Sequence, residues 1–394
     1  MHQAFFFEVR ILPFPSLPIQ FIFENIEVCE VSPGSEKVET DTGYGRLTIY
    51  LGVFGVMALS NAIVPVLPAF GAGPALQSSI YSAYFLGAFL TVLPAGLLSD
   101  RVGRIPVIRA GLAITLASGL LILVLKDPAL VLAARVLEGI GAGLFVASAM
   151  SWMNSRPEHE RTSGDFMASL NLGLLVGLLG SGLIAGALAN ERAGILAFTL
   201  ISVVPAVLAF LIREDAPGPR VAGAIPLRPA GIIWLYLSGV ILVGATGAIT
   251  ALYPSYTGEG PASLGVIIAT MNLATILAVI LASRLHLRPV RTLRISSVLL
   301  AGAVLLVPFS PLGFPIAGAL LGFIMIAQIA FLAGTGLPQG EAMGAYNAAS
   351  YAGMTFLPFL AGIIAGGIGF LPAFGVTAAL ALSMAVTIGK CGCE

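Results

Sequence analysis

Charge is scarce in this sequence, and lysine is the scarcest charged residue type. Only 10% of the 394 residues are charged, against about a quarter in soluble globular domains. The lysines are Lys37, Lys126 and Lys390. None of them ends the glycine-rich loop that binds nucleotide phosphates, which argues against an ATP-driven pump. The net charge of +0 gives no basic excess for binding nucleic acid.

Residues that bind metals or catalyse reactions are equally few. Cys29, Cys391 and Cys393 do not form a disulfide framework. Cys391 and Cys393 could bind a metal or carry a lipid, but we expect residues 391–394 to be a tail without such a function. The three histidines lie outside the apolar runs, at His2, His159 and His286. We therefore expect neither an enzyme nor a metal or cofactor.

Apolar residues dominate what remains. They make up 58% of the chain, and the mean hydropathy is +0.99. From Arg46 onward, apolar runs of about 20 residues follow one another, each long enough to cross a bilayer as a helix. The runs centre near Val56, Phe85, Ile114, Gly143, Val176, Pro205, Val243, Thr270, Val298, Ile324, Phe356 and Ala381. The sequence therefore predicts an all-α membrane protein with about twelve transmembrane helices.

Residues 1–45 differ from the rest. They hold seven acidic and two basic residues, and Glu8, Arg10, Pro13 and Pro15 interrupt any apolar stretch near the start. A signal peptide needs a basic start and an unbroken apolar segment. We expect a disordered cytoplasmic tail here.

Loop charges predict the orientation of the helices. If the tail is cytoplasmic, the external loops carry only Lys126 and Arg192. The internal loops carry Arg101, Arg104, Arg156, Arg161, Arg213, Arg220, Arg228, Arg284, Arg288, Arg291 and Arg294. This is the positive-inside bias. We expect a multi-pass protein of the plasma membrane with both termini cytoplasmic.

An internal repeat divides the chain into two halves. Gly182-Leu-Ile-Ala-Gly186 recurs as Gly362-Ile-Ile-Ala-Gly366, and Ser99, Arg104 and Pro106 have counterparts in Ser283, Arg288 and Pro289. The charged stretch 213–229 lies between the sixth and seventh runs. We predict a six-helix half at 46–212, a linker at 213–229 and a second six-helix half at 230–390. Parallel six-helix repeats are a transporter architecture.

The loop after the second run contains a more specific pattern. It reads Gly96-Leu-Leu-Ser-Asp100-Arg101-Val-Gly103-Arg104, and it resembles the signature loop of the major facilitator superfamily in spacing, residue types and position. Arg135-Val-Leu-Glu138-Gly139 in the fourth run is similar to another motif of that superfamily. Pro65-Val-Leu-Pro68 at the end of the first run resembles a motif of its drug–proton antiporter branch. The fifth-run motif of that branch is incomplete here, because Gly177 to Gly186 contains no proline.

The signature loop allows two interpretations. Arg101 and Arg104 could simply enforce topology, with Asp100 a solvated charge. Alternatively, Gly96, Asp100, Arg101, Gly103 and Arg104 form a conformational latch between the halves. In that case, Asp100 faces the positive end of the eleventh helix, and Glu341 at that end pairs with Arg101 or Arg104.

Arg135 and Glu138 are the one ionisable pair well inside an apolar run. At a spacing of i, i+3 they share a helical face, and the cost of burying either charge alone predicts that they pair inside the bundle. The pair could be purely structural. It could also couple transport to protons, since burial disfavours the charged carboxylate and a neighbouring arginine favours it.

Other residues are weaker candidates. The resemblance implies that helices one, four, seven and ten line a central cavity, which favours Asn61, Tyr253 and Gln328 beside Arg135. Two prolines and five glycines are candidates for helix packing or hinges, namely Pro65, Pro68, Gly177, Gly182, Gly186, Gly362 and Gly366.

Together these features predict a secondary transporter that works by alternating access. We expect proton-coupled export of a small amphipathic or drug-like compound by a monomer in the lipid bilayer. Proton-coupled uptake of a small nutrient, such as a monocarboxylate or sugar, is the alternative. A membrane sensor of the same fold that does not transport is a third possibility.

Overall fold

The computed structural model describes residues 39–154, 159–212, 232–285, 287–335 and 339–388. They belong almost entirely to one compact unit, Thr40–Glu394. The described residues form helices and no strand. The predicted linker at 213–229, the predicted tail at 391–394 and most of the predicted tail at 1–45 lie outside the described residues.

Seven helical elements make up the first half. They are α1 (Glu39–Ala62), the 3-10 helix η2 (Val64–Ala69), α2 (Pro74–Val102), α3 (Arg104–Val124), α4 (Pro128–Asn154), α5 (His159–Leu188) and α6 (Ala193–Leu208). The second half begins with α7 (Ile232–Ser238), the π-helix η3 (Gly239–Val243) and α8 (Gly244–Thr257). It continues with α9 (Pro261–Ala282), α10 (Pro289–Leu306), α11 (Gly313–Ala333), α12 (Gln339–Gly367) and α13 (Phe370–Thr387).

These elements form twelve apolar helical segments in two sets of six. Eleven segments of the described chain are long and apolar enough to cross a membrane, with α1 and η2 forming one of them and α7, η3 and α8 another. The twelfth, α6, is a shorter apolar helix. The predicted all-α membrane bundle is confirmed.

Two helix positions differ from the sequence prediction. The first helix begins at Glu39 rather than near Arg46, because its first residues are polar and carry no apolar signal. The sixth helix covers Ala193–Leu208, so Pro205 lies in its last turn instead of at its centre. The apolar residues 209–212 continue the hydropathy signal but form a turn.

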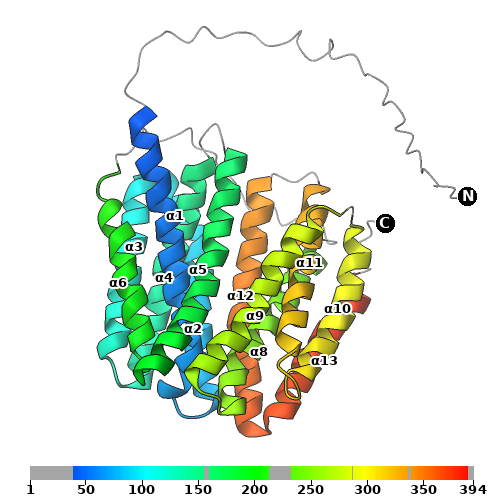
Figure 1. Ribbon diagram of the computed structural model, residues 1–394. Coiled ribbons are helices and arrows are strands. Elements are labelled where there is room, and N and C mark those ends of the chain that lie inside the picture. Colours follow the sequence, from blue (N-terminus) through cyan, green and yellow to red (C-terminus); the bar gives the residue numbers. More distant parts are fainter. Residues whose placement is uncertain (1–38, 155–158, 213–231, 286, 336–338, 389–394) are drawn as a thin grey trace, which may run out of the picture. The chain divides into compact units, whose positions relative to one another are not determined.

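Helix pairings in the two halves mirror one another. In the first half, α2 packs on α4 and α3 on α6, and in the second half α9 packs on α11 and α10 on α13. Across the halves, α2 packs on α12 and α5 packs on α9. The repeat that the sequence indicates is thus visible in the helix contacts, and Figure 1 shows the alternating direction of successive helices.

Successive helices alternate in direction, so the loops gather at two ends of the bundle. We call the end with the loops around Arg101–Arg104 and Arg284–Arg288 the arginine-rich end, and the other the opposite end. The halves approach most closely toward the opposite end. A Cβ atom added at Gly182 on α5 would lie 2.5 Å from the carbonyl oxygen of Pro261 on α9. One added at Gly362 on α12 would lie 2.5 Å from Cβ of Ser78 on α2.

The π-helix η3 interrupts the seventh membrane segment. A π-helix holds more residues per turn than an α-helix and usually occurs as a single turn. At this turn α12 comes so close that a Cβ atom at Gly353 would overlap the carbonyl oxygen of Val240. Glycine at position 353 therefore permits backbone contact between α12 and η3.

Candidate functional site

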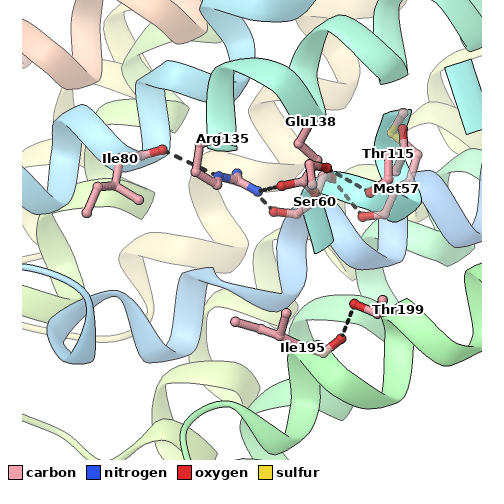
Figure 2. Close-up of polar contacts among 9 residues, drawn as sticks. Met57, Ser60, Ile80, Thr115, Arg135, Glu138, Ile195 and Thr199 are labelled. Atoms are coloured by element: carbon pink, nitrogen blue, oxygen red, sulfur yellow. Dashed lines mark hydrogen bonds and ion pairs between the residues drawn. The ribbon is translucent and has the colours of Figure 1, made fainter. Parts of the chain in front are cut away.

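The candidate site is an ion pair inside the first half. Nη1 of Arg135 lies 2.6 Å from Oε2 of Glu138. Both residues belong to α4, one turn apart, and their side chains are 1% and 0% exposed. The predicted contact between these residues is present, and Figure 2 shows it among the surrounding helices.

Arg135 also reaches two neighbouring helices. Its Nη2 donates a hydrogen bond to the carbonyl oxygen of Ser60 on α1 at 3.2 Å, and its Nε donates a longer one to that of Ile80 on α2 at 3.5 Å. Cζ of the guanidinium lies 4.9 Å from the centre of the Tyr84 ring, also on α2. A cation over an aromatic face at this distance is attracted to the ring. The arginine therefore ties α4 to α1 and α2, as Figure 2 shows for the two hydrogen bonds.

Glu138 is bonded on one side only. Its Oε2 accepts the hydrogen bond from Arg135, whereas its Oε1 is buried and accepts none from the described residues. A buried polar atom without a hydrogen bond is costly and uncommon in folded proteins. Such an atom in a buried carboxyl group is a chemically plausible place for a proton to bind.

Two glycines bring α2 and α4 together at this site. A Cβ atom at Gly139 would overlap the carbonyl oxygen of Tyr84, and one at Gly87 would overlap that of Val136. Small residues at a helix interface let the backbones approach closely. This approach places α2 next to Arg135. The glycine that follows Glu138 in the fourth-helix motif thus has a packing role.

The proposed latch residues lie apart from this site, at the arginine-rich end. Asp100 and Arg101 are exposed in the last turn of α2, and Arg104 is half-buried at the start of α3. Gly103 joins the two helices with φ of 94°, a conformation that favours glycine. Among the described residues, no ion pair joins Asp100, Arg101 or Arg104 to another side chain.

The other side of the proposed latch is only partly described. The backbone of Glu341 lies in the first turn of α12, but its side chain is outside the described residues. A Cβ atom added at Gly96 would meet nothing within 4 Å, and one at Gly344 would approach only Leu93, at 3.9 Å. The contact between α2 and α12 is thus looser at this end than at Gly362.

The signature loop, the repeat and the fold all point to one family. The family model described as Major Facilitator Superfamily matches residues 49–338. The chain belongs to the Major Facilitator Superfamily. The resemblance inferred from the loop at Gly96–Arg104 is confirmed, and the family and fold are those of membrane transporters.

Two curated members of the superfamily match parts of the chain. Multidrug resistance protein D of Escherichia coli (strain K12) is 36% identical over 111 residues, which are 28% of this chain and 28% of that protein. Cephamycin export protein CmcT of Amycolatopsis lactamdurans is 27% identical over 245 residues, 61% of this chain and 49% of that protein. The chain thus matches less than half the length of either relative.

Solved structures of the superfamily share the fold. The crystal structure of nucleoside transporter NupG superposes with a TM-score of 0.70 at 11% identity, covering 89% of this chain and 99% of that one. A bacterial homolog of the human lysosomal transporter Spinster, in an inward-facing and unoccupied conformation, gives 0.65 at 14% identity, covering 91% and 96%. At such identities the likeness concerns the fold alone.

The three weaker cavity candidates do not meet at one place. Asn61 is half-buried, and its Nδ2 donates to the carbonyl oxygen of Leu174 on α5 at 3.1 Å. The ring of Tyr253 packs edge-on against Phe314 of α11, with the ring centres 4.7 Å apart. Gln328 is fully buried within the second half. In this conformation, each of the three serves contacts between helices.

The proline and glycine candidates divide by location. Pro65 and Pro68 belong to η2, and Gly177 packs against Ala58 of α1 within the first half. The other four glycines face the opposite half. Gly182 and Gly186 on α5 contact α9, whereas Gly362 and Gly366 on α12 contact α2.

Sequence reasoning missed two groups of residues. Tyr84 and Ser60 meet Arg135, yet neither carries a local signal that distinguishes it from the other polar residues in apolar helices. Arg109 on α3 donates through Nε to the carbonyl oxygen of Ala209 at 2.9 Å and through Nη2 to that of Ile212 at 2.7 Å. It therefore provides donors for two carbonyl groups of the turn that follows α6.

Proposed function

We propose that this member of the superfamily is a secondary transporter that works by alternating access and exports a small amphipathic or drug-like compound in exchange for protons. The buried pair of Arg135 and Glu138 carries the proposal, together with Oε1 of Glu138, which accepts no hydrogen bond from the described residues. Burial disfavours the carboxylate and Arg135 favours it, so a modest change around the pair is enough to bind or release a proton.

The contacts between the halves support alternating access. They are tight at Gly182 and Gly362 and loose at Gly96 and Gly344. This is the arrangement of a transporter closed at one end. Export then requires a second conformation, in which the glycine contacts separate and Asp100 docks on α12. We propose that the arginine-rich end is cytoplasmic in the plasma membrane, because arginine-rich loops remain on that side.

The substrate class rests on the relatives and on the chemistry of the site. Both curated relatives carry names of export or drug-resistance proteins. The charge of Arg135 is already paired with Glu138, so it attracts the carboxylate of a nutrient less strongly than an unpaired arginine would. Export of an amphipathic compound fits these observations better than uptake of a monocarboxylate.

Proton flux in vesicles tests the proposal. Purified protein in liposomes that enclose a pH-sensitive dye is given ethidium, a lipophilic cation, as the first probe, followed by neutral amphipathic compounds. We expect the wild-type protein to move protons when a compound is transported, and Glu138→Gln to abolish this movement while the protein still folds. Glu259→Gln is the matched control, because Glu259 is an exposed carboxylate in a loop at the opposite end.

Each result has a definite meaning. Loss of proton movement in Glu138→Gln with retention in Glu259→Gln supports coupling through the ion pair. Normal coupling in Glu138→Gln would contradict it and leave Arg135 and Glu138 as a structural pair. Downhill ethidium transport without proton movement in the wild-type protein would contradict the exchange mechanism.

A further inference from the structure

A row of aromatic rings leads from the ion pair to the other half of the molecule. The Tyr84 ring lies against the guanidinium of Arg135 at 4.9 Å. Its centre is 5.0 Å from that of Phe85, with the rings nearly perpendicular at 88°. Phe85 in turn lies 6.4 Å from Tyr351 on α12. Three ring contacts thus connect α4 of the first half with α12 of the second.

Tyr84 occupies the middle position between the charges and the other half. It is 3% exposed, and its ring lies against the guanidinium of Arg135 and meets the Phe85 ring edge-on. Tyr351 makes no described hydrogen bond or ring contact with Arg135 or Glu138. The described contacts that connect Tyr351 with the pair run through Phe85 and Tyr84 of α2.

We infer that Tyr84 and Phe85 are positioning residues through which the docking of α2 on α12 controls the Arg135–Glu138 pair. This inference rests on the proposed alternating access. When the halves separate along α2 and α12, Phe85 loses its contact with Tyr351, and the Tyr84 ring loses the support that reaches it through Phe85. A ring with fewer supports holds the guanidinium less firmly. By thermodynamic linkage, protonation of Glu138 then changes the docking of α12 to the same extent.

The neighbours of Glu138 leave few other routes for such control. Arg135 on its own helix and Tyr84 on α2 are the described charged or titratable groups that interact with it. Tyr81 on α2 interacts with Arg135 and packs on the same Phe85 ring at 5.2 Å. From α1, the described contact with the pair is the carbonyl oxygen of Ser60. Among the described residues, α3 contributes no charged or titratable side chain to the pair.

A second aromatic contact between α2 and α12 provides the matched control. Phe89 on α2 and Phe356 on α12 have their ring centres 6.4 Å apart, the same separation as Phe85 and Tyr351. The described ring contacts do not connect Phe89 with Tyr84 or Arg135. Removing the Phe356 ring weakens the packing of α2 on α12. It leaves intact the ring contacts that lead from Tyr351 to the ion pair.

The test measures conformation against pH and needs no substrate. Spin labels are attached at Leu97 and Leu285, which are 56% and 48% exposed at the arginine-rich ends of the two halves. The background carries serine in place of the three cysteines. The distance between the labels in lipid nanodiscs is then followed by pulsed electron paramagnetic resonance from acid to alkaline pH. Variants are Glu138→Gln, Tyr84→Leu, Tyr351→Leu and Phe356→Leu.

The wild-type distance distribution should change with pH, and Glu138→Gln should abolish the change. Tyr351→Leu and Tyr84→Leu should move its midpoint by about 0.5 to 1 pH unit, the effect of losing one cation–π contact. The shift should be toward higher pH, because a guanidinium that is less firmly held stabilises the carboxylate less. Phe356→Leu should leave the midpoint within about 0.4 unit, since Phe356 is 54% exposed and exposed substitutions usually change stability by less than about 0.5 kcal/mol.

Two outcomes overturn the inference. One is an unchanged midpoint in Tyr351→Leu and Tyr84→Leu. The other is an equal shift in Phe356→Leu. That result would show that the overall packing of α2 on α12, rather than the row of aromatic rings, sets the midpoint. Either result leaves the proposed function standing if ethidium still drives proton flux through Glu138. Absence of that flux contradicts the proposed function whatever the labels report.

Discussion

Each half of the molecule contains a buried polar cluster that joins three helices, but the two clusters differ in charge. In the first half, Arg135 and Glu138 on α4 contact α1 and α2. In the second half, Nε2 of Gln328 on α11 donates to Oγ of Ser238 on α7 at 2.9 Å. The hydroxyl of Tyr346 on α12 donates to Oε1 of the same Gln328, also at 2.9 Å.

The two clusters also differ in how fully their polar atoms are hydrogen-bonded. Gln328 uses both ends of its amide, and the cluster carries no charge. The ion pair contains two charges and an oxygen that no described residue hydrogen-bonds. Replacing a buried ion pair with apolar side chains is often neutral or stabilising, so stability alone does not explain the presence of this one. The comparison supports placing the proposed proton chemistry in the first half, whereas the hydrogen bonds of the neutral cluster join helices of the second half.

Removing the positive charge should have the largest effect. Arg135→Leu leaves the Glu138 carboxylate buried without its partner, and we expect a loss of about 3 to 5 kcal/mol in the free energy of unfolding. Thermal unfolding in detergent at neutral pH measures it. The double variant Arg135→Leu with Glu138→Leu should recover most of the stability but not the proton coupling. Failure of the double variant to recover would show that the hydrogen bonds to α1 and α2, rather than the charges, dominate.

Disrupting the neutral cluster should have an intermediate effect and leave coupling intact. Gln328→Leu removes two hydrogen bonds between helices, each worth about 0.6 kcal/mol in a membrane protein. We expect a lower unfolding temperature but an unchanged pH profile of ethidium-driven proton flux. A shifted pH profile in this variant would break the distinction between the halves. Ser238→Ala, which removes one of the two bonds, should cause about half the loss.

Changing a charge in water should have the smallest effect on stability. Asp100→Asn alters an exposed side chain without a described ion pair, so the unfolding free energy should change by less than about 0.5 kcal/mol. We expect instead a weaker state in which the arginine-rich end is closed, because the proposed latch to α12 requires the carboxylate. Accessibility of single cysteines at that end to a maleimide measures the populations. Unchanged populations would favour the interpretation of Asp100 as a solvated charge.

The fold and the ion pair could be predicted from the sequence because their signals are local. Apolar runs, the loop at Gly96–Arg104 and the spacing of Arg135 and Glu138 each lie within one helix or one loop. The contacts around the pair could not be predicted in this way, because Ser60 and Tyr84 come from other helices and have no distinguishing neighbours in sequence.

The hydrogen-bond partners of a buried polar side chain are another feature that the sequence does not predict. Gln328 was a cavity candidate because the family resemblance implies that the tenth helix lines a central cavity, and a glutamine in an apolar helix needs a partner. The sequence does not show whether that partner is a substrate or another helix. The structure provides Ser238 and Tyr346. The glycines at 182 and 362 illustrate the same limit, since a small residue indicates close packing but not which helix packs there.

The π-helix at Gly239–Val243 affects where the chain can lose one residue without disturbing the fold. A single π-turn accommodates one residue more than the α-helix on either side of it, so α8 keeps the rotational setting of an uninterrupted helix. Deleting one codon within 239–243 would convert this turn to α-helix and leave the faces of α8 where they are. Deleting one codon within Gly244–Thr257 would instead turn the residues that follow by about 100° about the helix axis. The seventh membrane segment thus has one short stretch in which the deletion of a single amino acid is structurally mild.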